Sequence, residues 1–196
     1  WGGIAPPVHF RVDDPTGACI VVEYVDGKLN IHDNPLGVMT NSPTFDWHMI
    51  NLRNYMNLSA TDVEVRPLHE IKLAKTGVGS GMIGLPGDGT PPSRFVRAVA
   101  LTQAALPPRN DEEAIIQAIN ISHAMTFVKG LSRDMVNGKE VANYTQWTLM
   151  GDLTNGRLYF RTYDNADWKM VDLRKVDFGA AAAKHIPMKE KMVIPD

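Results

Sequence analysis

The chain has 196 residues, of which 44% are hydrophobic, and a formal net charge of -2 from 20 basic and 22 acidic residues. This length and composition predict a single globular domain over residues 1–196. There is no basic excess for nucleic acid or an anionic membrane surface, and no apolar run approaches the roughly 18 residues of a membrane span. We therefore expect neither nucleic acid nor membrane as a partner.

The first predicted elements form an antiparallel meander. The pair Asp26-Gly27 tolerates positive φ and separates two β-rich runs, which is typical of a hairpin. The predicted strands cover residues 8–12, 18–25 and 28–32, and a short fourth strand covers 38–40.

The first predicted helix has Ser42 as its N-cap and Pro43 at its first helical position. Apolar residues recur along it at helical spacing: Phe45, Met49, Leu52 and Met56. Residues 57–80 are predicted to be a long polar connection. The stretch "GVGSGMIGLPGDG" lacks the GxxxxGK[ST] pattern of a phosphate loop, so it is interpreted as turns and close backbone packing.

Two further helices are predicted. Thr90 caps the first, which has Pro91 at its first position and ends before Pro107. Asn110 caps the second, which could end at Gly130. Its predicted buried face comprises Ile115, Ile116, Ile119, His123 and Phe127, with His123 as a core histidine.

A second antiparallel meander is predicted from "YTQWTLMGDL", "RLYFRTY" and "WKMVDL", with turns at Asn155-Gly156 and Asp164-Asn165. Residues 179–196 have Ala-rich helical potential. The order of strands, helices and strands indicates a layered α+β fold, with two helices lying on antiparallel sheet.

Motifs for nucleophiles and metals are missing from the sequence. No GxSxG or SxxK pattern is present. The one cysteine, Cys19, lies in the β-prone run "ACIVVEY", where a cysteine is usually small core filler. The six histidines form no close ligand pair, and the side chains of Asp46 and His48 diverge on one helical turn, so no metal and no cofactor are expected.

Asn41 and Arg94 are the candidate catalytic residues, because each lies at the start of a predicted helix, where free N–H groups give positive potential. An Asn amide there can stabilise an oxyanion, and an Arg can position a carboxylate or lower the pKa of a thiol. Two alternatives stay open from spacing alone. Asn41 could be a turn former, and Arg94 could pair with Asp88 or Asp46.

Two long motifs resemble the choloylglycine hydrolase family of bacteria: "NPLGVMTNSPTFDWHMINLRNYMNLSA" and "GMIGLPGDGTPPSRFVRA". Two further stretches, "ACIVVEYVDGKLNIHDN" and "LYFRTYDNADWKMVDL", fit the same family. It includes bile salt hydrolases, penicillin V acylases and acyl-homoserine-lactone acylases, and it belongs to the N-terminal-nucleophile (Ntn) hydrolases. The resemblance implies antiparallel sheets in a four-layer αββα sandwich.

The family's nucleophile is a cysteine at the mature N-terminus, assisted by its α-amino group, by an Arg and an Asp shortly after it, and by a further Asn. None of these matches this chain. The resemblance therefore implies a C-terminal portion that lacks the nucleophile segment and is inactive alone. Asn41, in the "TNxPxFD" motif, is implied to support the oxyanion hole. Arg94, in "SRF", is implied to lie beside the nucleophile and tune its charge.

The implied activity is hydrolysis of a linear amide through a thioester acyl-enzyme, with a conjugated bile salt, penicillin V or an acyl-homoserine lactone as substrate. The alternative is a non-catalytic fragment or a diverged domain that binds a ligand or partner. The expected partners are the small-molecule amide, the missing N-terminal segment and further copies in a homo-oligomer. "TNSPTFDWH" and "GTPPSRF" look more like variants from Gram-negative bacteria, which implies a periplasmic or secreted protein.

Overall fold

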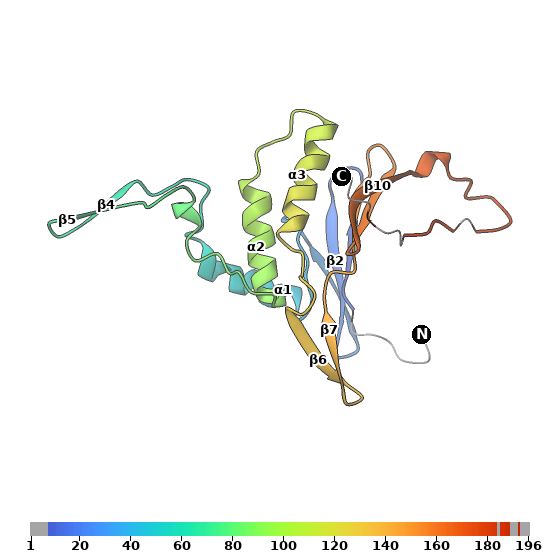
Figure 1. Cartoon of the computed structure of the whole chain (residues 1–196), viewed down its shortest axis with the longest axis horizontal. Coiled ribbons are helices and arrows are strands. Elements are labelled where there is room, and N and C mark those ends of the chain that lie inside the picture. Colours follow the sequence, from blue (N-terminus) through green and yellow to red (C-terminus); the bar gives the residue numbers. More distant parts are fainter. Residues whose placement is uncertain (1–7, 184, 189–191, 193–196) are drawn as a thin grey trace. The chain divides into compact units, whose positions relative to one another are not determined.

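The computed structural model of the chain describes residues 8–183, 185–188 and 192 (Figure 1). The chain divides between Pro107 and Pro108 into two compact units, Trp1–Pro107 and Pro108–Asp196, and each has its own helical and sheet elements. The single domain over residues 1–196 stays a prediction. No helix of the described residues is long and apolar enough to cross a membrane.

The first unit holds two helices, five strands and two 3-10 turns in its described residues. In chain order these are β1 (Phe10–Asp13), β2 (Cys19–Val25), β3 (Lys28–Asp33), α1 (Phe45–Leu52), η1 (Arg53–Tyr55), β4 (Val65–Leu68), β5 (Ile71–Ala74), η2 (Ser80–Met82) and α2 (Pro91–Ala104).

The predicted first meander is confirmed. β2 lies between β1 and β3, and both pairs are antiparallel. Asp26 and Gly27 join β2 to β3 with φ values of 50° and 74°, the left-handed conformation that a two-residue hairpin turn requires.

The core of the first unit lies between this sheet and the two helices. Val21 of β2 is fully buried against Phe45 of α1 and against Phe95 and Val99 of α2. Val38 completes the buried cluster from the segment that joins β3 to α1. The packing of two helices on antiparallel sheet therefore follows the prediction.

The predicted strand at 38–40 and the predicted start of α1 are wrong. Residues 38–40 pair with no strand among the described residues, and the Val38 carbonyl accepts a hydrogen bond from the Asn34 side chain (3.1 Å). Ser42 and Pro43, joined by a cis peptide bond, precede the helix, which begins at Phe45. The Phe45 N–H donates to both carboxyl oxygens of Glu23 (2.9 and 3.1 Å), so this side chain satisfies the helix start in place of Ser42.

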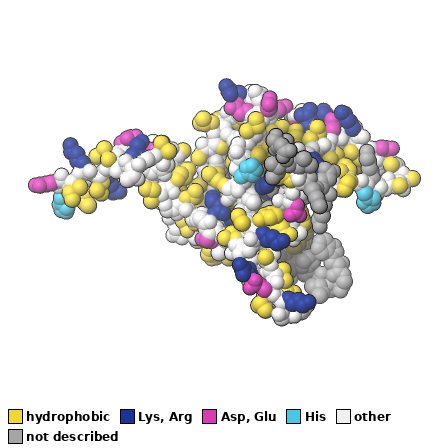
Figure 2. All heavy atoms as spheres, viewed as in Figure 1, with side chains coloured by type: hydrophobic (Ala, Val, Ile, Leu, Met, Phe, Trp, Pro, Cys, Tyr) yellow, Lys and Arg dark blue, Asp and Glu magenta, His cyan; other side chains and the backbone are white. Residues whose placement is uncertain are grey.

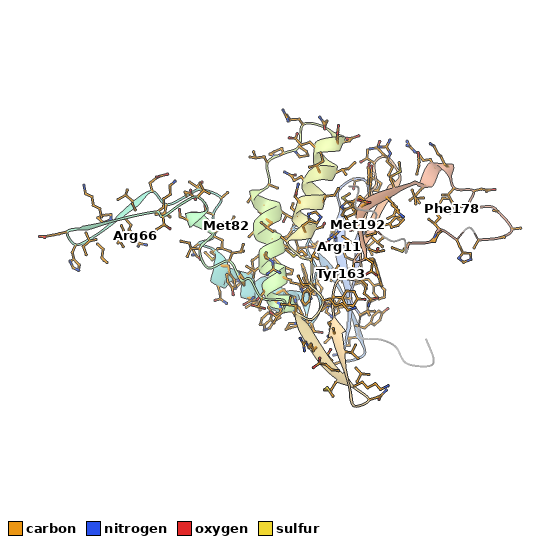
Figure 3. All side chains as sticks on the ribbon, viewed as in Figure 1. Arg11, Arg66, Met82, Tyr163, Phe178 and Met192 are labelled. Atoms are coloured by element: carbon orange, nitrogen blue, oxygen red, sulfur yellow. The ribbon has the colours of Figure 1, made fainter. Side chains whose placement is uncertain are left out.

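The connection predicted over residues 57–80 contains a hairpin that the sequence analysis missed. β4 and β5 pair antiparallel, and all of their residues are exposed. The hairpin extends away from α1 and α2 in Figure 1, and Figure 2 shows charged and apolar side chains interspersed along it. Arg66, a residue of β4, is labelled in this hairpin in Figure 3.

The second unit combines one helix with five strands and a short 3-10 turn in its described residues. In chain order these are α3 (Asp111–His123), β6 (Ser132–Val136), β7 (Lys139–Asn143), β8 (Trp147–Asp152), β9 (Arg157–Thr162), β10 (Asn165–Asp172) and η3 (Leu173–Lys175).

The two predicted helix caps have different outcomes. Asn110 caps α3 as predicted, because its Oδ1 accepts from the Glu113 N–H (2.9 Å). Thr90 is the N-cap residue of α2, but its hydroxyl donates to Asp88 (2.6 Å) and makes no capping bond. α3 ends at His123, seven residues before the predicted Gly130.

The predicted buried face of α3 is partly wrong. Ile116 is 52% exposed and His123 is also exposed, so His123 is no core histidine. His123 is the last residue of α3, and Ala124, which follows it, is exposed as well.

The second predicted meander is confirmed, with β9 between β8 and β10. The sequence analysis missed the hairpin β6–β7, whose turn is formed by Asn137 and Gly138, both at positive φ. The Ala-rich tail is not helical over 179–183, 185–188 and 192. Residues 180–183 are exposed, so no packing offsets the cost of helix nucleation. Residues 184, 189–191 and 193–196 lie outside the described part.

Replacing Glu23 with Leu is expected to lower the free energy of unfolding by about 3–5 kcal/mol, because the Phe45 N–H would lose its buried acceptor. Glu23→Gln keeps one acceptor oxygen and should cost about 1–2 kcal/mol. Urea unfolding measures both. The exposed control Glu140→Gln should change the value by less than about 0.5 kcal/mol. Equal stability of Glu23→Leu and the wild type would contradict the capping role.

Candidate functional site

The structure brings the two predicted site residues together, although they lie 53 positions apart. Arg94 Nη2 donates to Asn41 Oδ1 at 2.6 Å. Asn41 precedes α1 in the loop after β3, and Arg94 lies in the first turn of α2. The acidic partners that the sequence left open for Arg94 are engaged elsewhere, since Asp88 binds Thr90 and Asp46 faces His32 (3.1 Å).

The pair borders a cavity of about 280 Å³. Because Oδ1 of Asn41 accepts from the guanidinium, the amide nitrogen Nδ2 is the donor end of this side chain. The cavity is lined by Val8, His9, Met39, Thr40, Asn41, Ser42 and Arg94. An amide donor and a guanidinium thus lie at one small opening.

Arg94 is held by the turn that opens α2. Its Nε donates to the Gly89 carbonyl (3.1 Å). Asp88 accepts from the Ser93 hydroxyl (2.6 Å) and from the Thr90 hydroxyl and N–H. These hydrogen bonds lower the pKa of Asp88 to about 2, so its carboxylate stays ionised and orders the turn at ordinary pH. Burial lowers the pKa of Arg94 from its usual value, and the nearby Arg97 adds to this, but a guanidinium remains a cation in water-accessible sites.

His48 holds the backbone at Asn41. Its Nε2 lies 2.8 Å from the Asn41 carbonyl oxygen and 3.4 Å from the Thr40 hydroxyl. The side chain is buried at 1% exposure and its ring stacks on Phe95, with centroids 4.8 Å apart. Burial lowers the pKa of His48 below its ordinary 6.5, against the opposing effects of its bond to Asn41 and of Glu23.

A second contact ties the Asn41 loop to α2. The Thr40 hydroxyl donates to the Pro91 carbonyl (3.1 Å), one turn before Arg94. Residues 40 and 94 therefore belong to one hydrogen-bonded assembly, which explains how the two sequence motifs reach each other.

Behind the cavity lies a buried carboxyl group. Glu23 is 1% exposed and accepts from the Phe45 N–H, while His9 Nδ1 lies 2.8 Å and His32 Nε2 3.5 Å from its oxygens. His9 also lines the cavity. Glu23 thus connects the cavity wall to the start of α1.

Cys19 does not line this cavity. Burial raises the pKa of its thiol, and its hydrogen bond with Asp13 acts in the same direction. A thiol with a raised pKa is a poor nucleophile near neutral pH, in agreement with its prediction as a structural residue.

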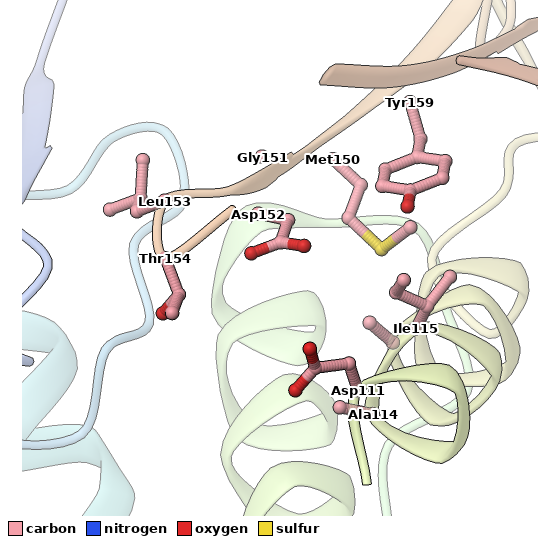
Figure 4. A pocket seen from close by; sticks show the side chains of 10 residues that line it. Asp111, Ala114, Ile115, Met150, Gly151, Asp152, Leu153, Thr154 and Tyr159 are labelled. Atoms are coloured by element: carbon pink, nitrogen blue, oxygen red, sulfur yellow. The ribbon is translucent and has the colours of Figure 1, made fainter. Parts of the chain in front are cut away.

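Two further cavities lie among the described residues. One of about 390 Å³ lies between η1 and α2 and is mostly apolar. The other, about 290 Å³, lies in the second unit between α3 and β8–β9 (Figure 4). Its two carboxylates, Asp111 and Asp152, both accept from the Asn155 side chain (3.0 and 2.9 Å) and so order a turn.

Within the described residues, no group of three or more His, Cys, Asp or Glu side chains could hold a metal ion. Asp46 and His48 diverge as predicted, because Asp46 faces His32 while the His48 ring packs on Phe95.

His48, Thr40 and Glu23 are parts of this site that the sequence motifs did not indicate. For His48 a signal was present, since it follows Phe45 by three residues and so lies on the buried face of α1. For Glu23 the sequence offers only one indication, an acidic residue within an otherwise apolar strand.

Comparisons with known proteins agree with this description. The sequence model of the linear amide C–N hydrolases, choloylglycine hydrolase family, matches residues 2–185. A bile salt hydrolase/transferase of Clostridium perfringens is 39% identical over 86% of this chain and 50% of the relative. A penicillin V acylase of Pectobacterium atrosepticum is 28% identical over 90% of this chain and 45% of the relative.

Solved structures resemble the chain closely. A mutant conjugated bile acid hydrolase from Clostridium perfringens matches with a TM-score of 0.84 and 36% identity over 96% of this chain and 56% of that one. A penicillin V acylase from Agrobacterium tumefaciens shares the fold, with a TM-score of 0.68 and 23% identity over 89% of this chain and 48% of that one. The predicted Ntn-hydrolase fold with antiparallel sheets is thereby confirmed. The chain spans about half the length of the curated relatives it matches.

The low pKa of His48 predicts a pH dependence of folding. Since burial lowers this pKa, the unfolded chain binds the proton at a higher pH than the folded chain. The His48 contribution is therefore fully present above pH 6.5 and is lost as the pH falls through the folded-state pKa. Electrostatic interactions with His9 and Arg94 also lower the pKa of His48, whereas Glu23 raises it.

Urea unfolding of the wild type and His48→Gln, between about pH 8 and pH 5, tests this expectation. The wild type should lose more free energy of unfolding on acidification than the variant, which has no titrating ring at this position. Parallel pH curves for the two proteins would contradict it.

Proposed function

Because this chain belongs to the choloylglycine hydrolase family of linear amide C–N hydrolases, we propose that the intact protein hydrolyses a linear amide at the Asn41–Arg94 cavity. One observation carries the proposal: Arg94 donates to Asn41 Oδ1 at 2.6 Å, which leaves the Asn41 amide nitrogen as a donor beside a cation. Such a pair suits a reaction that develops negative charge.

Asn41 is the proposed oxyanion donor. When a nucleophile attacks an amide carbonyl, the oxygen gains negative charge, and a preorganised N–H stabilises it without reorganisation. The Asn41 side chain meets this requirement because its Oδ1 is bonded to Arg94 and its backbone carbonyl to His48.

Arg94 is proposed to lie beside the nucleophile and to favour its charged form. A guanidinium lowers the pKa of a nearby thiol by stabilising the thiolate. Among the described residues that line the cavity none is acidic, so no carboxylate there offsets this effect.

The nucleophile is proposed to be an N-terminal cysteine thiolate on a segment outside this chain. Its sulfur attacks the amide carbon, and the tetrahedral intermediate expels the amine, which takes up a proton. Water then attacks the thioester, releasing the carboxylic acid and restoring the thiol. Since Cys19 does not line the cavity and its pKa is raised, we propose that this chain alone is inactive.

The names of the relatives, bile salt hydrolase and penicillin V acylase, suggest the substrate class. Conjugated bile salts and penicillin V are the proposed substrates, with acyl-homoserine lactones as a third group from the resemblance. All three are acyl amides whose acyl part is apolar. Homo-oligomer formation and export to the periplasm stay predictions.

Asn41→Ala and Arg94→Ala in the full-length protein should each lower kcat/KM by about 10²–10³, because each removes stabilisation that is realised in the transition state. The measurement is the rate of amine release from a conjugated bile salt, from penicillin V and from an acyl-homoserine lactone. Arg66→Ala and Asn120→Ala are matched controls at exposed positions and should leave the rate unchanged.

Wild-type rates in both site variants would refute their proposed roles. A full-length wild type that releases no amine from any of the three substrate classes would instead favour the alternative, a diverged domain that binds a ligand or partner.

A further inference from the structure

We propose that His48 is a positioning residue of the candidate site: its Nε2–H fixes the Asn41 backbone carbonyl and thereby the direction of the Asn41 side chain. The role in catalysis rests on the function proposed above. The geometric part, in which His48 orients Asn41 toward Arg94, can be tested separately.

The hydrogen-bond partners of His48 determine which ring nitrogen carries the proton. A carbonyl oxygen only accepts, so Nε2, at 2.8 Å from the Asn41 oxygen, must be the donor. The Thr40 hydroxyl donates to Pro91, so it too is an acceptor toward the ring, at 3.4 Å. One N–H therefore contacts two consecutive residues of the Asn41 loop.

The ring is itself fixed from the other side. It stacks on Phe95 with centroids 4.8 Å apart and planes 14° from parallel, and Phe95 is fully buried. Phe95 directly follows Arg94 in α2. The Nε2 edge of His48 thus contacts the Asn41 loop, and the face of its ring contacts Phe95, the residue next to Arg94. His48 therefore fixes the position of Asn41 relative to Arg94.

Stability alone does not explain a histidine here. Its Nδ1 is buried and has no hydrogen-bond partner within the described part of the chain. An unpaired buried acceptor disfavours folding, whereas an apolar side chain of similar size would fill the same space without it. The benefit that remains for the ring is the Nε2–H bond to Asn41.

The test compares a substitution that keeps a donor at position 48 with substitutions that remove it, in the full-length protein. His48→Gln places an amide nitrogen the same number of bonds from Cα as Nε2, so it can donate to Asn41. His48→Met fills the space without a donor, and His48→Leu replaces it if the Met variant fails to fold. All three lose the stacking on Phe95, so they differ mainly in the hydrogen bond. His123→Met, at an exposed position, is the matched control.

We expect His48→Met to lower kcat about tenfold or more with KM within about threefold, because the misdirected Asn41 affects the transition state more than substrate binding. His48→Gln and His123→Met should keep kcat within about threefold. The assay follows amine release from a conjugated bile salt and from penicillin V. Crystal structures of the same proteins should show the 2.6 Å contact between Arg94 and Asn41 in the wild type and the Gln variant, and its loss in the Met variant.

Two results would overturn the inference while leaving the proposed function intact. One is a wild-type kcat in His48→Met when Asn41→Ala is impaired. The other is an equal loss in the Gln and Met variants, which would indicate that the ring matters only for packing. If the wild type hydrolyses no amide, the proposed function fails, and the positioning role of His48 is then tested by the crystal structures alone. An unchanged Asn41–Arg94 contact in His48→Met would then refute the positioning role, and its loss would support it.

Discussion

The arrangement of the first unit depends on the carboxyl group of Glu23, which is buried where the central strand meets the first helix. A polar group in such a place is stable only when its hydrogen bonds are made, and Glu23 makes them with the Phe45 N–H and with His9. These bonds set where α1 begins. Since β3 fixes the other end of the intervening loop, the position of Asn41 follows from the burial of one side chain on β2.

Arg94 is held in place because neighbouring residues of α2 face opposite surroundings. Arg94 faces the cavity, while the next residue, Phe95, is fully buried against Phe45 and the His48 ring. Moving the guanidinium would therefore require repacking the core. Asp88 orders the turn before the helix, so the backbone on the N-terminal side is fixed as well. Preorganisation of this kind is what electrostatic stabilisation of a transition state requires.

The sequence predicted elements with local signals and missed those that depend on distant partners. The Asp26-Gly27 turn and the Asn110 cap are local, and both were found. The start of α1 was misplaced because its capping group lies 22 residues upstream. The Asn137-Gly138 hairpin had a local signal that was not used. For the candidate site, motifs predicted Asn41 and Arg94, but the contact between them and the contacts of His48 depend on the fold.

The charges around the cavity also bear on the proposed chemistry. Arg94 contributes a full positive charge, and burial keeps the neighbouring His48 neutral near pH 7. The carboxyl group of Glu23 is bonded to His9 and Phe45 behind the cavity wall, so it does not compete for the guanidinium. Among the described residues that line it, the cavity has the Arg94 cation and the Asn41 amide donor but no carboxylate, and this favours an anion at its mouth. A thiolate and the oxyanion it generates are both anions, so the same field would lower the pKa of the nucleophile and stabilise the intermediate.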